Sequence, residues 1–414
     1  MRFGLFYELQ LPRPWRPDSE LRIVHDTLKQ IELADRLGFD YAWAVEHHFL
    51  EEYSHCSAPE VLLGAASQRT ERIRLGHGIM VLPPGINAPA RVAERIGMLD
   101  LLCNGRAEFG TGESSTEVEL GAFGIEMSAK RAQWRESIDA VTRMFVEEPF
   151  AGYDGTYVQM PPRNIVPKPL QKPHPPMWTA CSKRESLTHA ARHGLGALTF
   201  SFVAPDEAEK WIGDYYATIE SEDCVPAGYS VNPQVAMTLY LMCHEDEATA
   251  RERGLADHRF FARSLAYYWG LGSHVPGKGD LARDLGLDTP RDQVDKEFPA
   301  VLEGAYSGIG TPEQIRRTLR EYEAAGVDQI LLIAQSGRIK HEHICSSMEL
   351  FAREVMPEFA ERHESAELAK AKRLAPAIEA ALARRTAARE VDPEYRVPRT
   401  AMPTALPRSA VQKG

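Results

Sequence analysis

The chain has 414 residues, 43% of them hydrophobic and 26% charged, with a formal net charge of -11. A chain of this length buries a large core, and α/β barrels commonly form one domain of ~250 residues or more. The negative charge disfavours binding to nucleic acid or to an anionic membrane surface, because both are polyanions. A small molecule or another protein is the expected partner.

Cysteine usage and the first residues bear on the compartment. The six cysteines are scattered and include no CxxC pair, which is typical of a reducing compartment. The opening MRFGLFYEL enters a strand-like segment without the layout of a signal peptide, and no apolar run approaches the ~20 residues that cross a bilayer. We therefore expect a cytoplasmic protein that does not contact membranes.

Short apolar runs alternate with helical patterns along most of the chain. The runs that predict strands are residues 2–7, 41–45, 73–82, 107–111, 176–181, 196–202, 234–243 and 329–334. The patterns that predict helices are residues 21–37, 59–69, 89–102, 130–145, 184–193, 206–219 and 312–325, the first of them ending at a capping glycine, Gly38.

Strands that alternate with helices form a parallel sheet through right-handed crossovers. Eight such strands predict an α/β fold in the form of a closed TIM (β/α)8 barrel. An open doubly wound sheet is the alternative, but no GxGxxG follows the first strand, and GTGESS after Phe109 matches that fingerprint only in part.

Two segments interrupt the alternation, at about 149–176 and 245–310. The first contains a predicted hairpin around YDGT (153–156), and the second contains a predicted helix at 248–265. Insertions in barrel enzymes usually build over the C-terminal face, where they shield a reaction from water. We divide the chain into a barrel domain, 1–362, and a tail, 363–414, in which an exposed helix precedes a Pro-rich end.

Glu46, His47 and His48 follow the predicted strand at 41–45 directly. Because strand side chains alternate, His47 faces one side while Glu46 and His48 face the other. Three interpretations are open: polar residues at the barrel rim, a metal site that adds His55 and Cys56, or a catalytic histidine at the C-terminal end of a strand. No HxxxH or paired-cysteine pattern supports a metal, so we predict none.

Four segments of the chain form a pattern together, and they are GFDYAWAVEHHF (38–49), RIRLGHGIMVLP (72–83), PARVAERIGMLDLLCNGRAEFGTGES (89–114) and IGTPEQ (309–314). In this order they resemble the bacterial-luciferase-like family of flavin-dependent monooxygenases, and the likeness runs from residue 2 to about 359. It implies a TIM-type barrel, reduced FMN (FMNH2) from a separate NAD(P)H:flavin reductase, and a homodimer. The implied reaction uses O2 and a C4a-peroxyflavin to oxygenate a small organic substrate in a dry pocket under the 245–310 insertion.

The resemblance also assigns catalytic residues. His47 matches the family's general base, and His48 and Glu46 beside it are implied to orient it or to contact substrate. Gly78 and Ile79 fall where the family often has a non-prolyl cis peptide beneath the flavin ring.

The predicted cofactor contacts also include Thr111, Ser182, Lys183 and Ser186. The last three match family positions near the FMN phosphate, at the start of the helix at 184–193, where free N–H groups and the positive end of the helix dipole favour an anion. Ser182 could instead only cap that helix. The chain departs from the luciferase α pattern at Gly112 and Glu113, which replace a reactive Cys and a phosphate-binding Arg; Glu113 must turn toward a basic residue or serve the substrate.

Other functions on the same barrel stay open. A deazaflavin-dependent dehydrogenase would need no oxygen, and a non-catalytic homologue would bind flavin without turnover. The sequence does not identify the substrate. Candidate aromatic walls of the pocket are Phe6, Tyr7, Trp43, Phe49 and Trp178, each of which could equally be a core residue.

Overall fold

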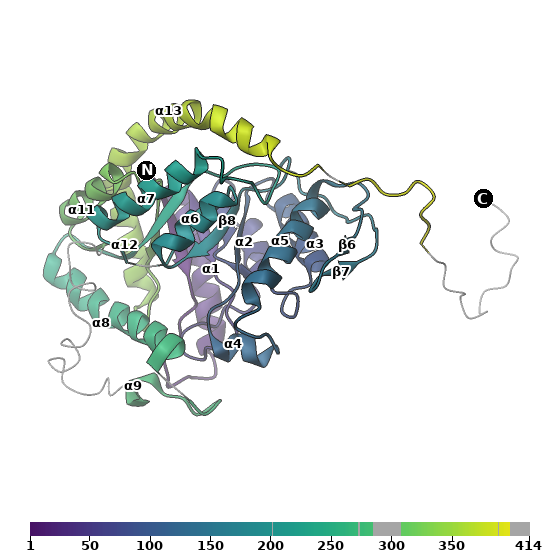
Figure 1. Cartoon of the computed structure of the whole chain (residues 1–414). Helices are drawn as coiled ribbons and strands as arrows, with labels where there is room; N and C mark the ends of the chain where they lie inside the picture. Colours follow the sequence, from purple (N-terminus) through teal and green to yellow (C-terminus); the bar gives the residue numbers. More distant parts are fainter. Residues whose placement is uncertain (201, 272–273, 285–307, 388, 398–414) are drawn as a thin grey trace, which may run out of the picture.

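The computed structural model describes residues 1–200, 202–271, 274–284, 308–387 and 389–397. Eight parallel strands form a barrel inside a ring of helices (Figure 1). In barrel order the strands are β1 (Arg2–Tyr7), β2 (Tyr41–Ala44), β3 (Arg74–His77), β5 (Ala107–Gly112), β8 (Met177–Cys181), β9 (Gly196–Thr199), β10 (Val235–Cys243) and β12 (Gln329–Ile333). Strand β12 pairs with β1, which closes the barrel and confirms the predicted TIM fold.

The predicted helices are present, with small shifts at their ends. They are α1 (Ser19–Leu37), α2 (Pro59–Ser67), α3 (Pro89–Leu102), α5 (Lys130–Val146), α6 (Arg184–Arg192), α7 (Pro205–Ile219) and α11 (Pro312–Ala324). Helix α1 ends at Gly38, whose φ of 87° is the left-handed conformation predicted for this cap. Helices α4 (Glu117–Ala122) and α12 (His341–Glu354) and the short strand β11 (Gly308–Gly310) were not predicted.

The single strand predicted at 73–82 is wrong. Strand β3 ends at His77, and a two-residue strand, β4 (Met80–Val81), resumes after a cis peptide bond between Gly78 and Ile79. The N–H of Gly78 donates to the carbonyl of Ala44 at 2.8 Å, and the carbonyl of Ile79 accepts from the N–H of Glu46 at 3.1 Å. The cis bond lies where the family resemblance implied one, whereas the run of apolar residues gives no local signal for the break.

The barrel interior is filled by two tryptophans that the glycines opposite them accommodate. A Cβ atom on Gly76 would lie 2.2 Å from the Trp43 ring, and one on Gly196 would lie 2.4 Å from the Trp178 ring. The two indoles meet edge to face at 5.4 Å. Trp43 and Trp178, which the sequence offered as pocket walls, are therefore core residues, as is the buried Tyr7.

Both insertions have the elements that were predicted in them. Strands β6 (Tyr153–Asp154) and β7 (Gln159–Met160) form the hairpin. The second insertion contains α8 (Glu247–Ala266), a π-helical turn η1 (Tyr267–Leu271) and α9 (Leu281–Asp284). The part of it at 285–307 lies outside the described residues.

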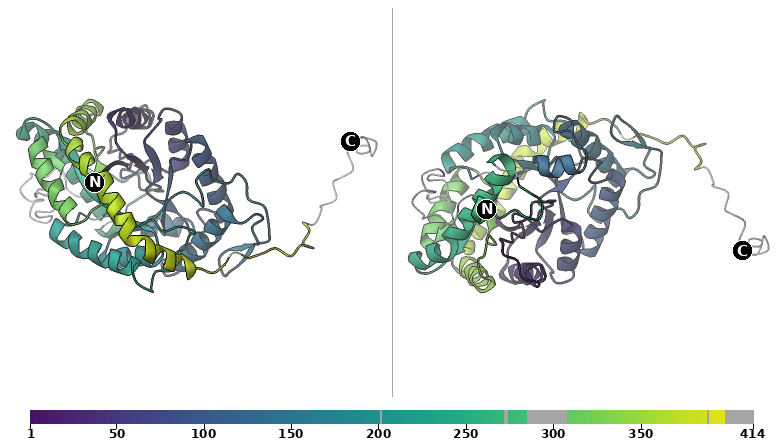
Figure 2. Two further views of the ribbon diagram at one scale, coloured as in Figure 1. Left: turned by 90° about the horizontal axis from the view of Figure 1, so that it is seen from above. Right: turned by 90° about the horizontal axis from the view of Figure 1, so that it is seen from below.

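Helix α13 (Met356–Ala383) crosses the N-terminal end of the barrel (Figure 2, left). Arg2, at the start of β1, donates to His363 at 2.7 Å, and Lys370 pairs with Asp328, just before β12, at 2.6 Å. One side of the helix thus packs on the barrel, with Leu374 fully buried, whereas an exposed helix was expected. The Pro-rich end at 398–414 lies outside the described residues. None of the helices that are described is long and apolar enough to span a membrane.

Candidate functional site

A cavity of about 800 Å³ opens at the C-terminal ends of the strands. Residues just beyond the ends of β1, β2, β3, β5 and β8 line it, among them Glu8, His47, Gly78, Glu113 and Ser182. The second insertion adds Phe261, Leu265 and Trp269 to the wall. This agrees with the expectation that this insertion shields the site.

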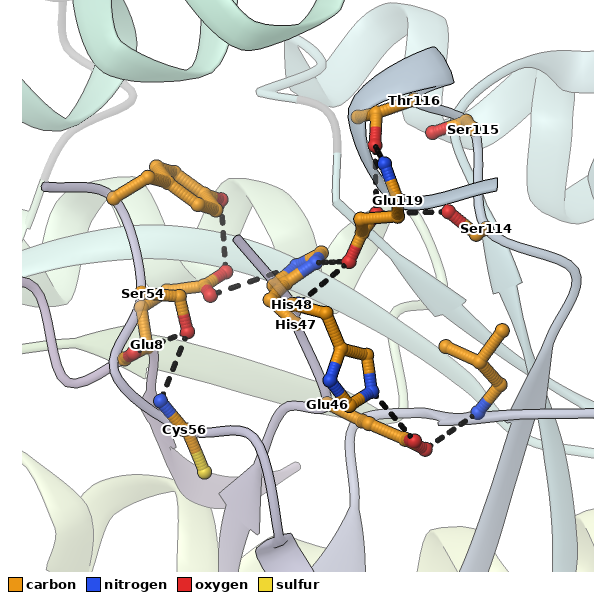
Figure 3. Close-up of polar contacts among 12 residues, drawn as sticks. Glu8, Glu46, His47, His48, Ser54, Cys56, Ser114, Ser115, Thr116 and Glu119 are labelled. Carbon is orange, nitrogen blue, oxygen red and sulfur yellow. Dashed lines mark hydrogen bonds and ion pairs between the residues drawn. The ribbon is translucent and has the colours of Figure 1, made fainter. Parts of the chain in front are cut away.

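His47 lies between two carboxylates (Figure 3). Its Nδ1 is 3.0 Å from Oε1 of Glu119, and its Nε2 is 3.7 Å from Oε2 of Glu8. The rings of Tyr53 and Trp269 pack edge-on against the imidazole, with centroids 5.5 and 5.6 Å away. These contacts set the position of the ring from four sides.

Glu119 is held in place by three donors besides His47. Ser114 and Thr116 donate their hydroxyls to its Oε2, both at 2.8 Å, and the backbone N–H of His48 donates to its Oε1 at 3.0 Å (Figure 3). Thr116 is the N-cap of α4 and accepts from the N–H of Glu119 at 3.2 Å. The sequence analysis missed Glu119, although Thr-x-x-Glu is the signature of a capped helix start.

The carboxylates decide the charge of His47. Burial alone would lower the pKa of His47, but the negative charges of Glu119 and Glu8 raise it to about 9. Burial would likewise raise the pKa of Glu119, yet the His47 cation and the donated hydrogen bonds lower it to about 2. The raised pKa of His47 favours the doubly protonated imidazole, and so a proton donor, over the general base that the resemblance implied.

Glu8 is a second group that the sequence analysis missed. Its side chain is 3% exposed, and its Oε1 accepts from the hydroxyl of Tyr53 at 2.8 Å. Its Oε2 has no hydrogen bond to any described residue. Burial raises the pKa of Glu8 to about 7, against the opposing effects of His47 and Tyr53. Glu8 directly follows β1, so the rule that selected His47 at the end of β2 applies to it as well.

Glu46 and His48 pair with each other, but strand alternation does not explain this, because β2 ends at Ala44 and both residues lie beyond the strand. Glu46 accepts from the backbone N–H of Val81 at 2.8 Å and from the Asn87 amide at 2.7 Å, and lies 3.1 Å from Nε2 of His48. The His48 ring packs on Phe123 and is not part of the cavity wall. Glu46 is part of the cavity wall, but its carboxylate is hydrogen-bonded to Val81 and Asn87 near β4. These contacts are typical of residues that hold the backbone in place.

The predicted flavin-ring residues line the cavity, with one exception. Gly78 and Ile79 are both in the wall, and a Cβ atom on Gly112 would lie 2.3 Å from the Ile79 side chain, so that contact requires glycine. Thr111 is fully buried instead. Its hydroxyl donates to the Trp178 carbonyl at 3.0 Å and accepts from the Trp134 indole at 3.2 Å, because its side chain points to α5.

The predicted phosphate turn lies at another part of the wall. Ser182, Lys183 and Ser186 all line the cavity, and the Ser186 hydroxyl accepts from the N–H groups of Ser182 and Lys183, both at 3.0 Å. The Ser186 hydroxyl donates to the Lys183 carbonyl at 2.6 Å, and the Ser186 N–H donates to the same carbonyl at 3.0 Å. The N–H groups of Arg184 and Glu185 begin α6, where a helix offers no acceptor of its own, so an anion here would meet N–H donors at the helix start.

Glu113 turns to a basic residue, one of the two options that the sequence left open. Its Oε1 lies 2.6 Å from Arg131, a residue of α5 that also lines the cavity. The sequence analysis missed Arg131, which supplies positive charge near the turn although it comes from another element. Arg184, by contrast, pairs with Asp214 at 2.6 Å.

The candidate metal ligands and the candidate aromatic wall residues can also be placed in the structure. Among the described residues, no three His, Cys, Asp or Glu side chains are placed to hold a metal ion, and His55 pairs with Glu20 at 3.1 Å. Phe6 lines the cavity as expected, whereas Phe49 is 52% exposed and packs on Phe123.

Comparisons with known proteins agree with this architecture. The oxygenase component of a flavin-dependent trigonelline monooxygenase from Acinetobacter baylyi is 24% identical over 368 residues, which are 87% of this chain and 96% of that protein. The crystal structure of monooxygenase RslO1 from Streptomyces bottropensis is similar with a TM-score of 0.71 and 27% identity, over 87% of this chain and 100% of that one.

A further structure shares the fold alone. It is a coenzyme F₄₂₀-dependent tetrahydromethanopterin reductase from Methanopyrus kandleri, with a TM-score of 0.61 and 20% identity, over 86% of this chain and 99% of that one. The family model for luciferase-like monooxygenases matches residues 1–329, which is more than half of the sequence. The chain therefore belongs to the luciferase-like monooxygenase family.

Proposed function

We propose that the protein is the oxygenase of a two-component system, which uses reduced FMN and O2 to oxygenate a small organic substrate. The observation that carries the proposal is one cavity whose wall contains both His47, with its Nδ1 3.0 Å from Glu119, and an anion-compatible helix start at Ser182–Ser186. Membership of the luciferase-like family supports it, as does the relative that is named as the oxygenase component of a flavin-dependent monooxygenase.

The residues of the cavity fit FMN. Its volume of about 800 Å³ lies in the range of sites that enclose a cofactor and a small ligand. The phosphate would bind at the start of α6 through Ser182, Lys183 and Ser186, with Arg131 near it, and the ring would lie over Gly78 and Ile79. When bound, the reduced flavin supplies the electrons that activate O2.

The protein's own groups would handle protons and exclude water. His47 would present the Nε2 proton to oxygen atoms in the cavity, while Glu119 holds the other ring nitrogen and keeps the imidazole charged. Phe261, Leu265 and Trp269 of the second insertion would keep solvent from this proton.

Two partners belong to the proposal. A separate NAD(P)H:flavin reductase would supply the reduced FMN, as the family resemblance implies and as a relative named as an oxygenase component supports. A homodimer is the expected assembly, on the basis of the family resemblance.

A deazaflavin-dependent dehydrogenase is the second candidate, because the fold is shared with the coenzyme F₄₂₀-dependent reductase. Anaerobic titration of the protein with reduced FMN, oxidised FMN and reduced deazaflavin coenzyme separates the two. The proposal predicts tighter binding of reduced FMN than of either other compound. Preference for the deazaflavin would support the dehydrogenase, and equal affinity for oxidised and reduced FMN would contradict capture of the reduced form.

A further inference from the structure

The Oε2 atom of Glu8 accepts no hydrogen bond from a described residue, although it faces the Nε2 of His47. This oxygen is buried, and the Glu8 residue lines the cavity. The Nε2 of His47, which carries a proton at neutral pH, lies 3.7 Å from it, beyond hydrogen-bond distance. Leaving a buried carboxylate oxygen unpaired is costly, so a ligand that donates to Oε2 would gain from this site.

The Glu8 carboxylate and the His47 N–H together favour one kind of functional group on a ligand. A ligand that bridges them must donate to Glu8 and also accept from His47. A hydroxyl does both. An ammonium group cannot accept the His47 proton, a carboxylate cannot donate to Glu8 and is repelled by it, and an aldehyde oxygen only accepts.

The walls beside Glu8 are aromatic. Tyr53, Phe261 and Trp269 form one connected cluster, in which the Tyr53 centroid is 5.5 Å from Phe261 and 5.3 Å from Trp269. Phe6 and Phe200, with centroids 5.0 Å apart, add to the cavity wall. Rings pack on rings by offset or edge-on contacts, so this wall favours a flat aromatic ligand.

We propose that the substrate is a phenol or naphthol whose hydroxyl binds between Glu8 Oε2 and His47 Nε2, with Glu8 as the base that ionises it. This inference rests on the proposed function for its place in a reaction. Glu8 would be the catalytic residue for substrate activation, and His47 would stabilise the oxygen anion.

The step balances without a co-reactant. The substrate O–H bond breaks, its proton moves to Oε2 of Glu8, and the electron pair stays on the substrate oxygen. That oxygen accepts a hydrogen bond from the Nε2–H of His47, and no group is oxidised or reduced. The pKa of Glu8, raised by burial to about 7, makes it a stronger base than an ordinary carboxylate. Ionisation makes the ring electron-rich, which suits attack on an electrophilic oxygen.

The test compares two probes that differ in one proton. Equilibrium binding of 2-naphthol and of 2-methoxynaphthalene is measured on the flavin-free protein. We expect 2-naphthol to bind at least 10-fold more tightly to the wild type. In Glu8→Leu this preference should fall below 2-fold, and Glu8→Asp should restore part of it.

Glu147→Gln is the matched control, because it removes another buried carboxylate, which pairs with Arg143 outside the cavity wall. It should keep the wild-type preference. A wild type that binds both probes equally overturns the proposal even if Glu8→Leu does not fold, and so does a folded Glu8→Leu variant that retains the full preference.

A second measurement separates this inference from the proposed function. Oxygen consumption is followed after the protein is mixed with reduced FMN. A normal oxygen response with no difference between the probes would overturn the phenol assignment alone. A clear probe preference that depends on Glu8, without any effect of the protein on oxygen consumption, would overturn the monooxygenase assignment and leave the hydroxyl site in place.

Discussion

His47 Nδ1 lies 3.0 Å from Glu119 Oε1, and this contact joins the end of β2 to the short helix α4. The folded protein raises the pKa of His47 to about 9, above the ~6.5 of an unfolded histidine. The stabilisation that comes from the charged imidazole is therefore fully present below pH ~6.5 and is lost as pH rises through about 9. Glu119 has the opposite sign, because its lowered pKa gives stability that is lost only as pH falls through about 2.

Glu119→Gln should lower the free energy of unfolding by ~1.5–3 kcal/mol at pH 6, the range for a hydrogen bond to a charged group. The gap between wild type and variant should narrow from pH ~6.5 toward 9 as His47 loses its proton. Denaturant unfolding across this pH range measures the gap. Glu147→Gln is the control, since its partner Arg143 does not titrate there and the gap should stay constant. A Glu119→Gln gap that is flat with pH would show that His47 is not charged in the folded protein.

His47→Gln should reduce turnover by ~10²–10⁴-fold, the usual loss for a removed proton donor or acceptor. Binding of reduced FMN should change little, because the phosphate turn and the Gly78–Ile79 segment are untouched. Steady-state assays with supplied reduced FMN, together with a flavin titration, check both statements. His48→Gln is the matched control, since its ring is outside the cavity wall and should matter far less. An equal loss of turnover in His47→Gln and His48→Gln would contradict a catalytic role that is particular to His47.

Arg131→Ala should weaken the binding free energy of FMN by ~1.5–3 kcal/mol, the value of one charge-assisted hydrogen bond. The further changes Ser186→Ala and Lys183→Ala should weaken FMN binding more. Riboflavin, which has no phosphate, should be affected much less by the same changes. Arg184→Ala serves as the control, because that side chain pairs with Asp214 and is not in the cavity wall. Unchanged affinities for both flavins would place the phosphate elsewhere.

Gly76→Ala should destabilise the barrel by ~1–3 kcal/mol, because the added Cβ atom meets the Trp43 ring in a closed core. Gly64→Ala in α2 should instead stabilise by ~0.5–1 kcal/mol, since nothing lies within 4 Å of its Cβ position and alanine favours a helix. Thermal or denaturant unfolding of the two variants measures whether each change raises or lowers the free energy of unfolding. A stable Gly76→Ala protein would mean that Trp43 can repack.

The sequence predicted the barrel well, because alternation of apolar runs and helical patterns is a local signal that repeats eight times. It failed where the signal is not local. The run at 73–82 reads as one strand in its local pattern, and only the family resemblance indicated the cis bond between Gly78 and Ile79 that divides it. Helix α4 is too short for its periodicity to be recognised. The packing of α13 on the barrel depends on contacts of Arg2 and Asp328, far from it in sequence.

The site was predicted only in part, because only its local features can be recognised in the sequence. His47 stands at the end of a strand, where barrel enzymes keep catalytic groups, and the sequence singled it out. Its electrostatics depend on Glu8 and Glu119, which are brought to it by the fold from 39 residues before and 72 residues after. Thr111 was wrongly predicted to contact the cofactor, because the strand pattern does not show that its side chain faces the Trp134 indole of α5 and not the cavity.

The central claim is that this protein directs the reaction of reduced FMN with oxygen. Its most direct test mixes the anaerobic complex of the protein and reduced FMN with O2 and follows the appearance of oxidised flavin. The account predicts that the protein-bound flavin reoxidises with a time course different from that of free reduced FMN, and that the difference saturates as protein is added. Identical time courses with and without saturating protein would contradict it.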